Sequence, residues 1–248
     1  MEAILSQRKH MASALAAYGK LVWQAMITTI RHYQPSDQPA VLDISAGTAF
    51  FGDPVEAFLD DRRLYNDAFA RYYTEYETSL VWVADSPDGL VGFLFGCVDT
   101  SSQVNQWRKY IISKVLVRAI EGKYRLGRRT SNFAFGMLAG MVRGEETKVD
   151  LKEYPAHLQI DVQMGYRGEG VGRRLIEAYL DQLRQNHVCG VHLQTTNHNE
   201  AACHLYEKIG FMLLDERHNR FWTSMLSIEV KNRSYGLKLR QSGDLYYD

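Results

Sequence analysis

The chain has 248 residues, of which 46% are apolar and 23% charged, and its 29 basic residues balance its 29 acidic ones. This composition is typical of a globular protein and excludes a disordered or collagen-like chain. The zero net charge provides no whole-chain attraction to nucleic acid or to an anionic membrane, and no run reaches the roughly 18 apolar residues of a membrane span. The three widely spaced cysteines predict reduced thiols, as expected of a cytoplasmic protein.

The first quarter of the chain is predicted to contain an extension, one strand and several helices. Residues 1–25 are expected to form a helical extension and not a targeting signal, because the apolar run is short and no cleavage site follows it. Residues 26–32, rich in β-branched side chains, predict the first strand, and Asp37 is expected to cap a short helix. A loop at 45–53 and one or two helices at 54–76 follow.

The next part of the chain predicts a β-hairpin and then a long helical segment. The apolar runs 80–84 and 90–96 flank the turn sequence Asp-Ser-Pro-Asp-Gly. Residues 101–150 carry ten basic and four acidic residues, and their apolar stretches at 107–120 and 133–141 predict helices. So long a connection rarely lacks structure of its own, so a helical insertion is expected here.

The second half is predicted to alternate strands and helices. One segment is amphipathic, with apolar residues on one stripe and charged residues opposite, and Gly210 is a typical left-handed helix stop. In chain order the expected elements are a strand at 157–163, a glycine-rich turn at 165–172, a helix at 171–185, a strand at 191–196, a helix at 199–209, a last hairpin of 211–214 with 221–230, and a tail strand at 235–239.

The most informative motif is the glycine-rich run from Arg167 to Arg173, between a strand and a helix. Unpaired amides at such a helix start point outward together and suit a pyrophosphate. A P-loop is excluded because Val171-Gly172 stand where Lys and Ser or Thr are needed. A dinucleotide fingerprint is excluded because Arg173 replaces its last glycine. The pattern Arg/Gln-x-x-Gly-x-Gly/Ala fits at Arg167, Gly170 and Gly172.

That pattern resembles the acetyl-CoA loop of the GNAT superfamily of N-acetyltransferases. Residues 199–211 resemble the family's N-x-x-A-x-x-L-Y-x-x-x-G-F helix, and the similarity extends over about 26–100 and 155–230. Within the superfamily, residues 154–161 with 190–193 look closest to the acetyltransferase-like domain of O-GlcNAcases and its free-standing bacterial relatives. Many members have proline where this chain has Met164.

The resemblance implies an α/β (α+β) fold, with a mixed, mostly antiparallel sheet of about six to seven strands flanked by helices. Strands 4 and 5 are expected to splay apart, within a single domain at 26–248 that carries the insertion between strands 3 and 4. The insertion is expected to cover the acceptor side or to form a dimer contact beside it. Arg125, Arg128 and Arg129 would then favour an anionic acceptor or the cofactor phosphates.

The resemblance also implies acetyl-CoA-dependent transfer to a primary amine, with Tyr206 as the acid and Asp161 or His157 as the base. The Val162 N–H would stabilise the oxyanion. The acceptor is expected to be a small amine or an amino sugar, in preference to a protein lysine. The implied cofactor contacts are Ile160, Val162, Gln163, Arg167, Gly168, Glu169, Gly170, Val171, Gly172, Arg173 and Asn199.

Several alternatives remain open from the sequence. The chain can be an acyl-CoA-binding pseudoenzyme, or a protein-interaction module on the same fold, because no base stands out. Asn199 can serve as a helix cap alone. No metal is expected, because His192, His198 and His204 are spaced by six and not by the four of a helical zinc pair. No nucleic-acid or membrane partner is expected either.

Overall fold

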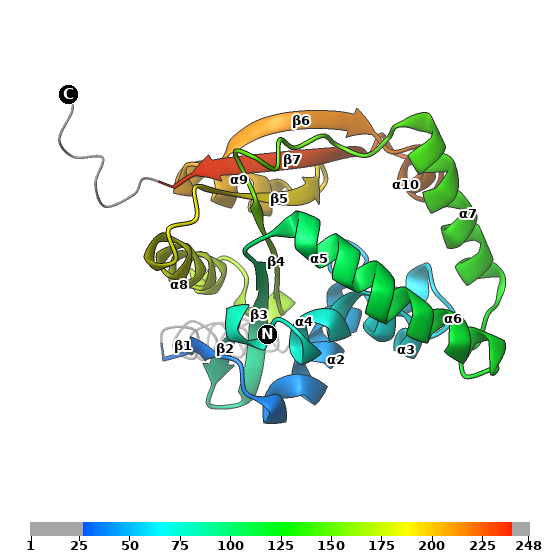
Figure 1. The fold of residues 1–248 in the computed structure, drawn as a ribbon, viewed down its shortest axis with the longest axis horizontal. Helices are drawn as coiled ribbons and strands as arrows, with labels where there is room; N and C mark the ends of the chain where they lie inside the picture. Colours follow the sequence, from blue (N-terminus) through cyan, green and yellow to red (C-terminus); the bar gives the residue numbers. More distant parts are fainter. Residues whose placement is uncertain (1–26, 240–248) are drawn as a thin grey trace, which may run out of the picture.

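Seven strands form one mixed sheet in the computed structural model, which describes residues 27–239 (Figure 1). The order across the sheet is β1-β2-β3-β4-β5-β7-β6, and only β4 and β5 are parallel neighbours. This confirms the predicted fold class. The strands are β1 (Thr29–His32), β2 (Val81–Ser86), β3 (Gly89–Cys97), β4 (Ala156–Val162), β5 (Gly190–Thr196), β6 (Met212–His218) and β7 (Lys231–Lys238). The expected extension at 1–25 lies outside the described residues.

Helices cover both faces of the sheet and also form a long connection between β3 and β4 (Figure 1). The α-helices are α2 (Gln38–Thr48), α3 (Arg62–Tyr65), α4 (Arg71–Glu75), α5 (Thr100–Gln106), α6 (Ser113–Ile120), α7 (Arg128–Arg143), α8 (Val171–Gln185), α9 (Glu200–Ile209) and α10 (Arg220–Leu226). Shorter or wider turns are η1 (Pro35–Asp37), η2 (Val55–Ala57), η3 (Asn66–Ala70), η4 (Thr78–Leu80), η5 (Trp107–Ile112) and η6 (Met164–Tyr166).

The alternation of side chains along β3 divides the core into two clusters. Leu94 packs with the apolar stripe of α8, where Leu175 and Ile176 are fully buried. Phe93 and Phe95 point to the opposite face and pack with residues of α2 and α4. Because successive side chains of a strand alternate between faces, one central strand supplies both cores.

The sheet opens at β4 and β5, as the resemblance predicts. These strands pair only at Ala156 with Val191 and at His157 with His192, and they diverge beyond. The fully buried Tyr179 of α8 lies where the gap begins. Its hydroxyl accepts from the Cys97 N–H at 2.9 Å and lies 3.0 Å from the His157 carbonyl oxygen. One phenol therefore ties β3, β4 and α8 together at the start of the gap.

Replacing Tyr179 with phenylalanine tests this tie. The variant keeps the ring but leaves the buried Cys97 N–H without its acceptor. We expect the free energy of unfolding to fall by about 1–3 kcal/mol in urea denaturation. Exposed Tyr110 makes a matched control, and its phenylalanine variant should change stability little. A Tyr179→Phe protein as stable as the parent would contradict the assignment.

Three predicted elements are wrong in detail. The loop expected at 45–53 is shorter, because α2 continues through Thr48. Asp37 provides no side-chain cap for α2; its carboxylate accepts from the Gln34 N–H and pairs with Arg31. The strand expected at 221–230 is instead the helix α10, and the last hairpin is formed by β6 and β7.

The connection between β3 and β4 is helical, and two of its elements, η5 and α7, pack on different parts of the fold. The Trp107 indole N–H donates to the Ala68 carbonyl oxygen at 2.6 Å, and Ile111 is buried in the α2-side core. The last helix, α7, packs on α10 across Gly136, where a Cβ would lie only 2.2 Å from the Phe221 ring. The insertion thus runs away from the sheet and returns to the β6–β7 end (Figure 1).

Candidate functional site

Two cavities meet at the opening between β4 and β5. The smaller, of about 320 Å³, lies between the glycine-rich loop, β4 and α9. The larger, of about 530 Å³, is lined from α2, β4, β5 and α10. Both are lined by the same five residues: Ile160, Asp161, Arg167, Asn199 and Tyr206. Any group bound at this junction is therefore accessible from both cavities.

The smaller cavity contains an uncapped helix start. Gly168 and Gly170 have φ of 81° and 79°, in the left-handed region that favours glycine. The Arg174 N–H donates to the Gly170 carbonyl oxygen, and no side chain among the described residues caps α8. The amides of residues 171–173 therefore lack intrahelical acceptors, so this end of α8 is suited to an anion.

The edge of β4 that faces the gap offers backbone groups to a ligand. The Gln163 N–H donates to the Val91 carbonyl oxygen on β3 at 2.9 Å. Because backbone groups alternate along a strand, those of Ile160 and Val162 point the other way, toward the gap. The Val162 carbonyl oxygen accepts from Arg167 Nε at 2.8 Å, whereas its N–H points into the opening.

The structure brings together eight of the eleven predicted cofactor residues. The eight lining the smaller cavity are Ile160, Val162, Arg167, Gly168, Gly170, Gly172, Arg173 and Asn199. Gln163, Glu169 and Val171 do not line it, and Val171 is 0% exposed in the core. Asn199 makes no side-chain cap bond, so capping alone does not explain it. The Arg167 guanidinium lies against Gly52, on the side of the larger cavity.

Asp161 is a half-buried carboxyl at the junction. Burial raises its pKa to about 7, and the hydrogen bonds from Gln159 and Thr48 and the charge of Arg167 offset only part of that shift. At neutral pH this group therefore exists in both its protonated and ionised forms, as a general base requires. It shares a face of β4 with His157 and Gln159, as the strand alternation predicted.

Tyr206 is 5% exposed and also lies at the junction. Burial and the nearby Asp161 raise its pKa above the ordinary 10, so the phenol stays protonated at neutral pH. Its ring packs near Phe211 and Tyr235, which fix its direction. A protonated, oriented phenol between two cavities is suited to donate a proton.

The third catalytic candidate, His157, is held in a hydrogen-bonded chain. The Thr100 hydroxyl donates to the Pro155 carbonyl oxygen at 2.7 Å, so it accepts from His157 Nδ1 at 2.8 Å. The other ring nitrogen, Nε2, then accepts from the Tyr73 hydroxyl at 2.7 Å. Burial lowers the pKa of His157 to about 3. The ring is thus neutral with both nitrogens engaged, so His157, although it lines the larger cavity with Tyr73 and Thr100, has no free nitrogen to accept a proton.

The larger cavity has an aromatic wall that no sequence motif predicts. Phe51, from the loop after α2, and Trp222, from α10, both line it, and their ring centroids are 5.8 Å apart. Phe58 and Phe133 pack behind Trp222. Phe51 and Trp222 come from segments for which the sequence predicts a loop and a strand.

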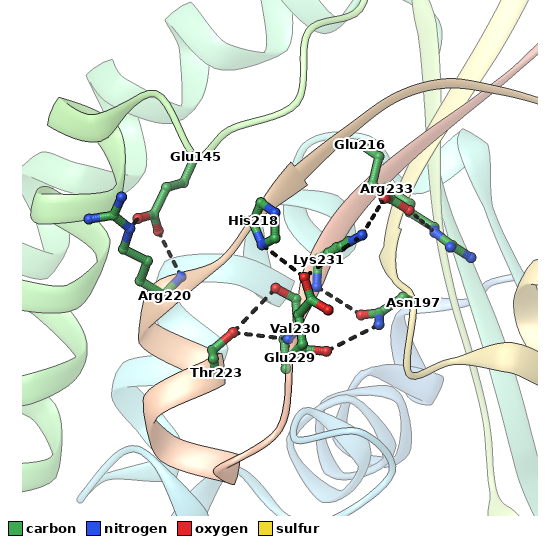
Figure 2. Close-up of polar contacts among 10 residues, drawn as sticks. All are labelled: Glu145, Asn197, Glu216, His218, Arg220, Thr223, Glu229, Val230, Lys231 and Arg233. Atoms are coloured by element: carbon green, nitrogen blue, oxygen red, sulfur yellow. Dashed lines mark hydrogen bonds and ion pairs between the residues drawn. The ribbon is translucent and has the colours of Figure 1, made fainter.

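Polar contacts hold α10 in place (Figure 2). The Arg220 N–H donates to Glu145, just after α7, at 3.1 Å. The Thr223 hydroxyl accepts from the Val230 N–H at 2.9 Å, at the start of β7. The Asn197 carboxamide oxygen accepts from the Lys231 N–H at 2.8 Å. Trp222 is therefore carried by a helix that is tied to the insertion and to β7.

The insertion contributes to the larger cavity indirectly. No residue of 101–150 lines either cavity, so the expectation that this segment itself covers the acceptor side is wrong. Arg125, Arg128 and Arg129 do not line them either; Arg129 lines a separate cavity between α7 and α10. The reason is that α7 packs on α10, and α10 supplies the cavity wall.

Known acetyltransferases share sequence and fold with this chain. The family model described as acetyltransferase (GNAT) family matches residues 50–211. The E. coli K12 [ribosomal protein bS18]-alanine N-acetyltransferase is 33% identical over 98 residues, 40% of this chain and 66% of that protein. Bacillus subtilis streptothricin acetyltransferase A is 39% identical over 54 residues, 22% of this chain and only 31% of its own length. The crystal structure of SsHAT superposes with a TM-score of 0.64 and 27% identity, covering 86% of this chain and 99% of that one.

Within residues 27–239, no group of three His, Cys, Asp or Glu side chains is arranged to hold a metal ion. None of the helices in that range is long and apolar enough to cross a membrane.

Proposed function

Since this chain belongs to the acetyltransferase (GNAT) family, we propose that it transfers the acetyl group of acetyl-CoA directly to a primary amine. The observation that carries the proposal is the meeting of the two cavities at Asp161 and Tyr206. One cavity has the uncapped helix start, and the other has room for a second substrate. Transfer between two bound molecules requires such a junction, because the reacting atoms must come into contact.

The smaller cavity is the proposed cofactor site. The free amides of residues 171–173 and the positive end of the α8 dipole would bind the pyrophosphate. The gap-facing groups of Ile160 and Val162 would bind the pantetheine arm as an added strand does. These contacts use backbone groups, which explains why the loop needs Gly168 and Gly170 more than it needs particular side chains.

The residues at the junction divide the chemistry among them. Asp161 in its ionised form would accept the proton that the acceptor ammonium must lose before its nitrogen attacks the thioester carbon. The Val162 N–H would donate to the carbonyl oxygen as negative charge develops there. As the carbon–sulfur bond breaks, Tyr206 would donate its proton to the leaving thiolate. The attacking nitrogen would then lose its remaining extra proton to the Tyr206 phenolate, which restores the phenol and gives an N-acetylated amine and free CoA.

A substitution at Gly170 tests the cofactor site. Gly170→Asp would place a carboxylate beside the proposed pyrophosphate, and we expect calorimetry to show acetyl-CoA affinity about 100-fold lower. Gly170→Asn should lose less, because it adds similar bulk without charge. Gly144→Asp is the matched control, since Gly144 has φ of 69° and open space around it but does not line the cavity. Equal affinity in folded Gly170→Asp and parent proteins would refute the site.

Turnover separates an enzyme from an acyl-CoA-binding pseudoenzyme. With a panel of small primary amines, an enzyme releases CoA and forms the acetylated amine in equal amounts, as followed with a thiol reagent and mass spectrometry. A pseudoenzyme binds acetyl-CoA and releases none. The protein-interaction alternative instead predicts a co-purifying partner that is lost when the insertion is disrupted, with no dependence on Gly170.

A further inference from the structure

The loop after α2 holds one aromatic residue in a strained conformation. Phe51 has φ of 53°, and the next residue, Gly52, has φ of 105°. A bulky side chain rarely occupies this left-handed region. The loop is closed by two backbone bonds between Phe50 and Asp53, at 2.8 and 2.9 Å. The strain does not serve burial, because Phe51 is 40% exposed and lines the larger cavity. Such strain is found preferentially at functional positions.

Trp222 meets Phe51 at the same wall. Their rings are 5.8 Å apart with an interplanar angle of 86°, so they form a corner. Phe58 and Phe221 lie 5.2 and 4.7 Å from the Trp222 ring, behind it, and the contacts shown in Figure 2 hold its helix. Among the described residues the indole N–H of Trp222 has no hydrogen-bond acceptor. The corner therefore offers two aromatic faces and one donor.

The rest of the larger cavity is polar but carries few charges. Its lining includes the carboxamides of Gln159 and Gln194 and the hydroxyls of Thr195 and Thr196. These groups both donate and accept, as the hydroxyls of a ligand do. Within residues 27–239, Asp161 supplies the one carboxylate of this lining and Arg167 the one guanidinium. A linear polyamine would bring several positive charges to a site with a single negative one.

We propose that Phe51 and Trp222 form an acceptor-binding wall that selects an amino sugar, an inference that rests on the proposed acetyl transfer. A hydroxylated saturated ring has an apolar C–H face that packs on aromatic rings and a rim of hydroxyls that reaches the carboxamides opposite. Its amine is then directed to Asp161, at the junction with the cofactor cavity. The strained loop keeps Phe51 in the cavity before the acceptor arrives.

The test compares wall variants with a control outside the cavity. The probes are D-glucosamine, spermidine and a short peptide with an N-terminal alanine. In Phe51→Leu and Trp222→Leu we expect the KM for glucosamine to rise at least 10-fold, with the KM for acetyl-CoA unchanged. Phe135→Leu, on the exposed face of α7, should leave both constants unchanged. Trp222→Phe should restore part of the loss, because it restores an aromatic face.

Phe51→Gly distinguishes recognition from a structural role. Because glycine adopts a positive φ without strain, we expect the melting temperature to stay equal or rise while the KM for glucosamine rises. A melting temperature that falls, with kcat and both KM values unchanged, would overturn the proposal and make Phe51 a packing residue.

The remaining outcomes separate this inference from the proposed function. If spermidine or the peptide is acetylated and glucosamine is neither acetylated nor bound in calorimetry, the wall does not select a sugar, although acetyl transfer stands. If glucosamine binds to the parent but not to Phe51→Leu, and no amine is acetylated, the wall stands and the transferase proposal fails. Glucosamine binding that is equal in all variants overturns the wall.

Discussion

Replacement of Asp161 by asparagine should lower kcat by about 100- to 1000-fold, because Asp161 is the one carboxylate among the described residues that line the proposed acceptor cavity. Asparagine has nearly the same size and keeps hydrogen bonding to Gln159, but it cannot accept the ammonium proton. The KM for acetyl-CoA should change little. Asp181→Asn, at an exposed position of α8, is the control and should keep full activity.

The pH dependence of the reaction provides a second readout of Asp161. Burial raises its pKa to about 7, so the ionised base accumulates as pH rises through 7. We expect kcat to rise between pH 6 and pH 8 in the parent and to lack this rise in Asp161→Asn. A variant that keeps both the rate and the rise would show that the proton leaves by another route, for example through the Tyr73–His157 chain.

The same pKa shift predicts that this variant is more stable than the parent at high pH. The folded-state pKa of Asp161, about 7, lies above its ordinary 3.8, so the fold favours the neutral carboxyl. Stability conferred by Asp161 is present below about pH 4 and is lost as pH rises to about 7. Asp161→Asn should therefore gain about 1–2 kcal/mol over the parent at pH 8, after allowance for solvent at this partly exposed group, and little at pH 4.

Replacement of Tyr206 by phenylalanine should lower turnover by about 10- to 1000-fold and leave acetyl-CoA affinity nearly intact. The variant keeps the ring that packs near Phe211 and Tyr235 and removes only the proton donor. Tyr235→Phe is a matched control, because Tyr235 is a buried tyrosine of the same core that lines neither cavity.

Measuring the turnover of Tyr206→Phe at several pH values makes this test decisive. If leaving-thiolate protonation depends on Tyr206, the deficit should appear at every pH from 6 to 9, since burial and Asp161 keep the phenol protonated over that range. A Tyr206→Phe enzyme with the parent's rate at each pH would mean that water protonates the thiolate, and the proposed acid would be wrong.

Local patterns were sufficient to predict the half of the fold that holds the proposed cofactor site. The residues of α8 match the predicted range, and the glycines that precede it are in the conformation that the motif requires. Gly210 ends α9 at φ of 109°. These features are encoded within a few residues of sequence, so they can be predicted without knowledge of the tertiary contacts.

The acceptor cavity was much less predictable, because it is assembled from distant segments. Phe51 and Trp222 are 171 positions apart, and Tyr73 reaches His157 across 84 positions. The segment that became α10 is rich in apolar and aromatic residues and suggested a strand. It is helical because Asn219 caps its start by accepting from the Trp222 N–H, and because α7 packs on it. Such tertiary contacts leave no periodic pattern in the sequence.

The position of the insertion could not be predicted from the sequence. Its helical character followed from its length and its apolar residues, but its position did not. Phe133 packs 4.9 Å from Phe58 and 6.0 Å from Trp222, so α7 supports the cavity wall from behind. The sequence predicts that the insertion covers the acceptor side. In the structure, α7 packs on α10, which places the insertion behind the cavity wall.

A crystal structure with acetyl-CoA bound would show whether the cofactor lies on α8 with its acetyl group at the junction of the two cavities. We expect the pyrophosphate at the amides of residues 171–173 and the acetyl carbonyl oxygen within hydrogen-bond distance of the Val162 N–H. The sulfur should lie beside the Tyr206 hydroxyl, with the carbonyl carbon open toward the cavity of Asp161 and Trp222. Density for the pyrophosphate away from α8, or an acetyl group directed away from Asp161, would contradict it.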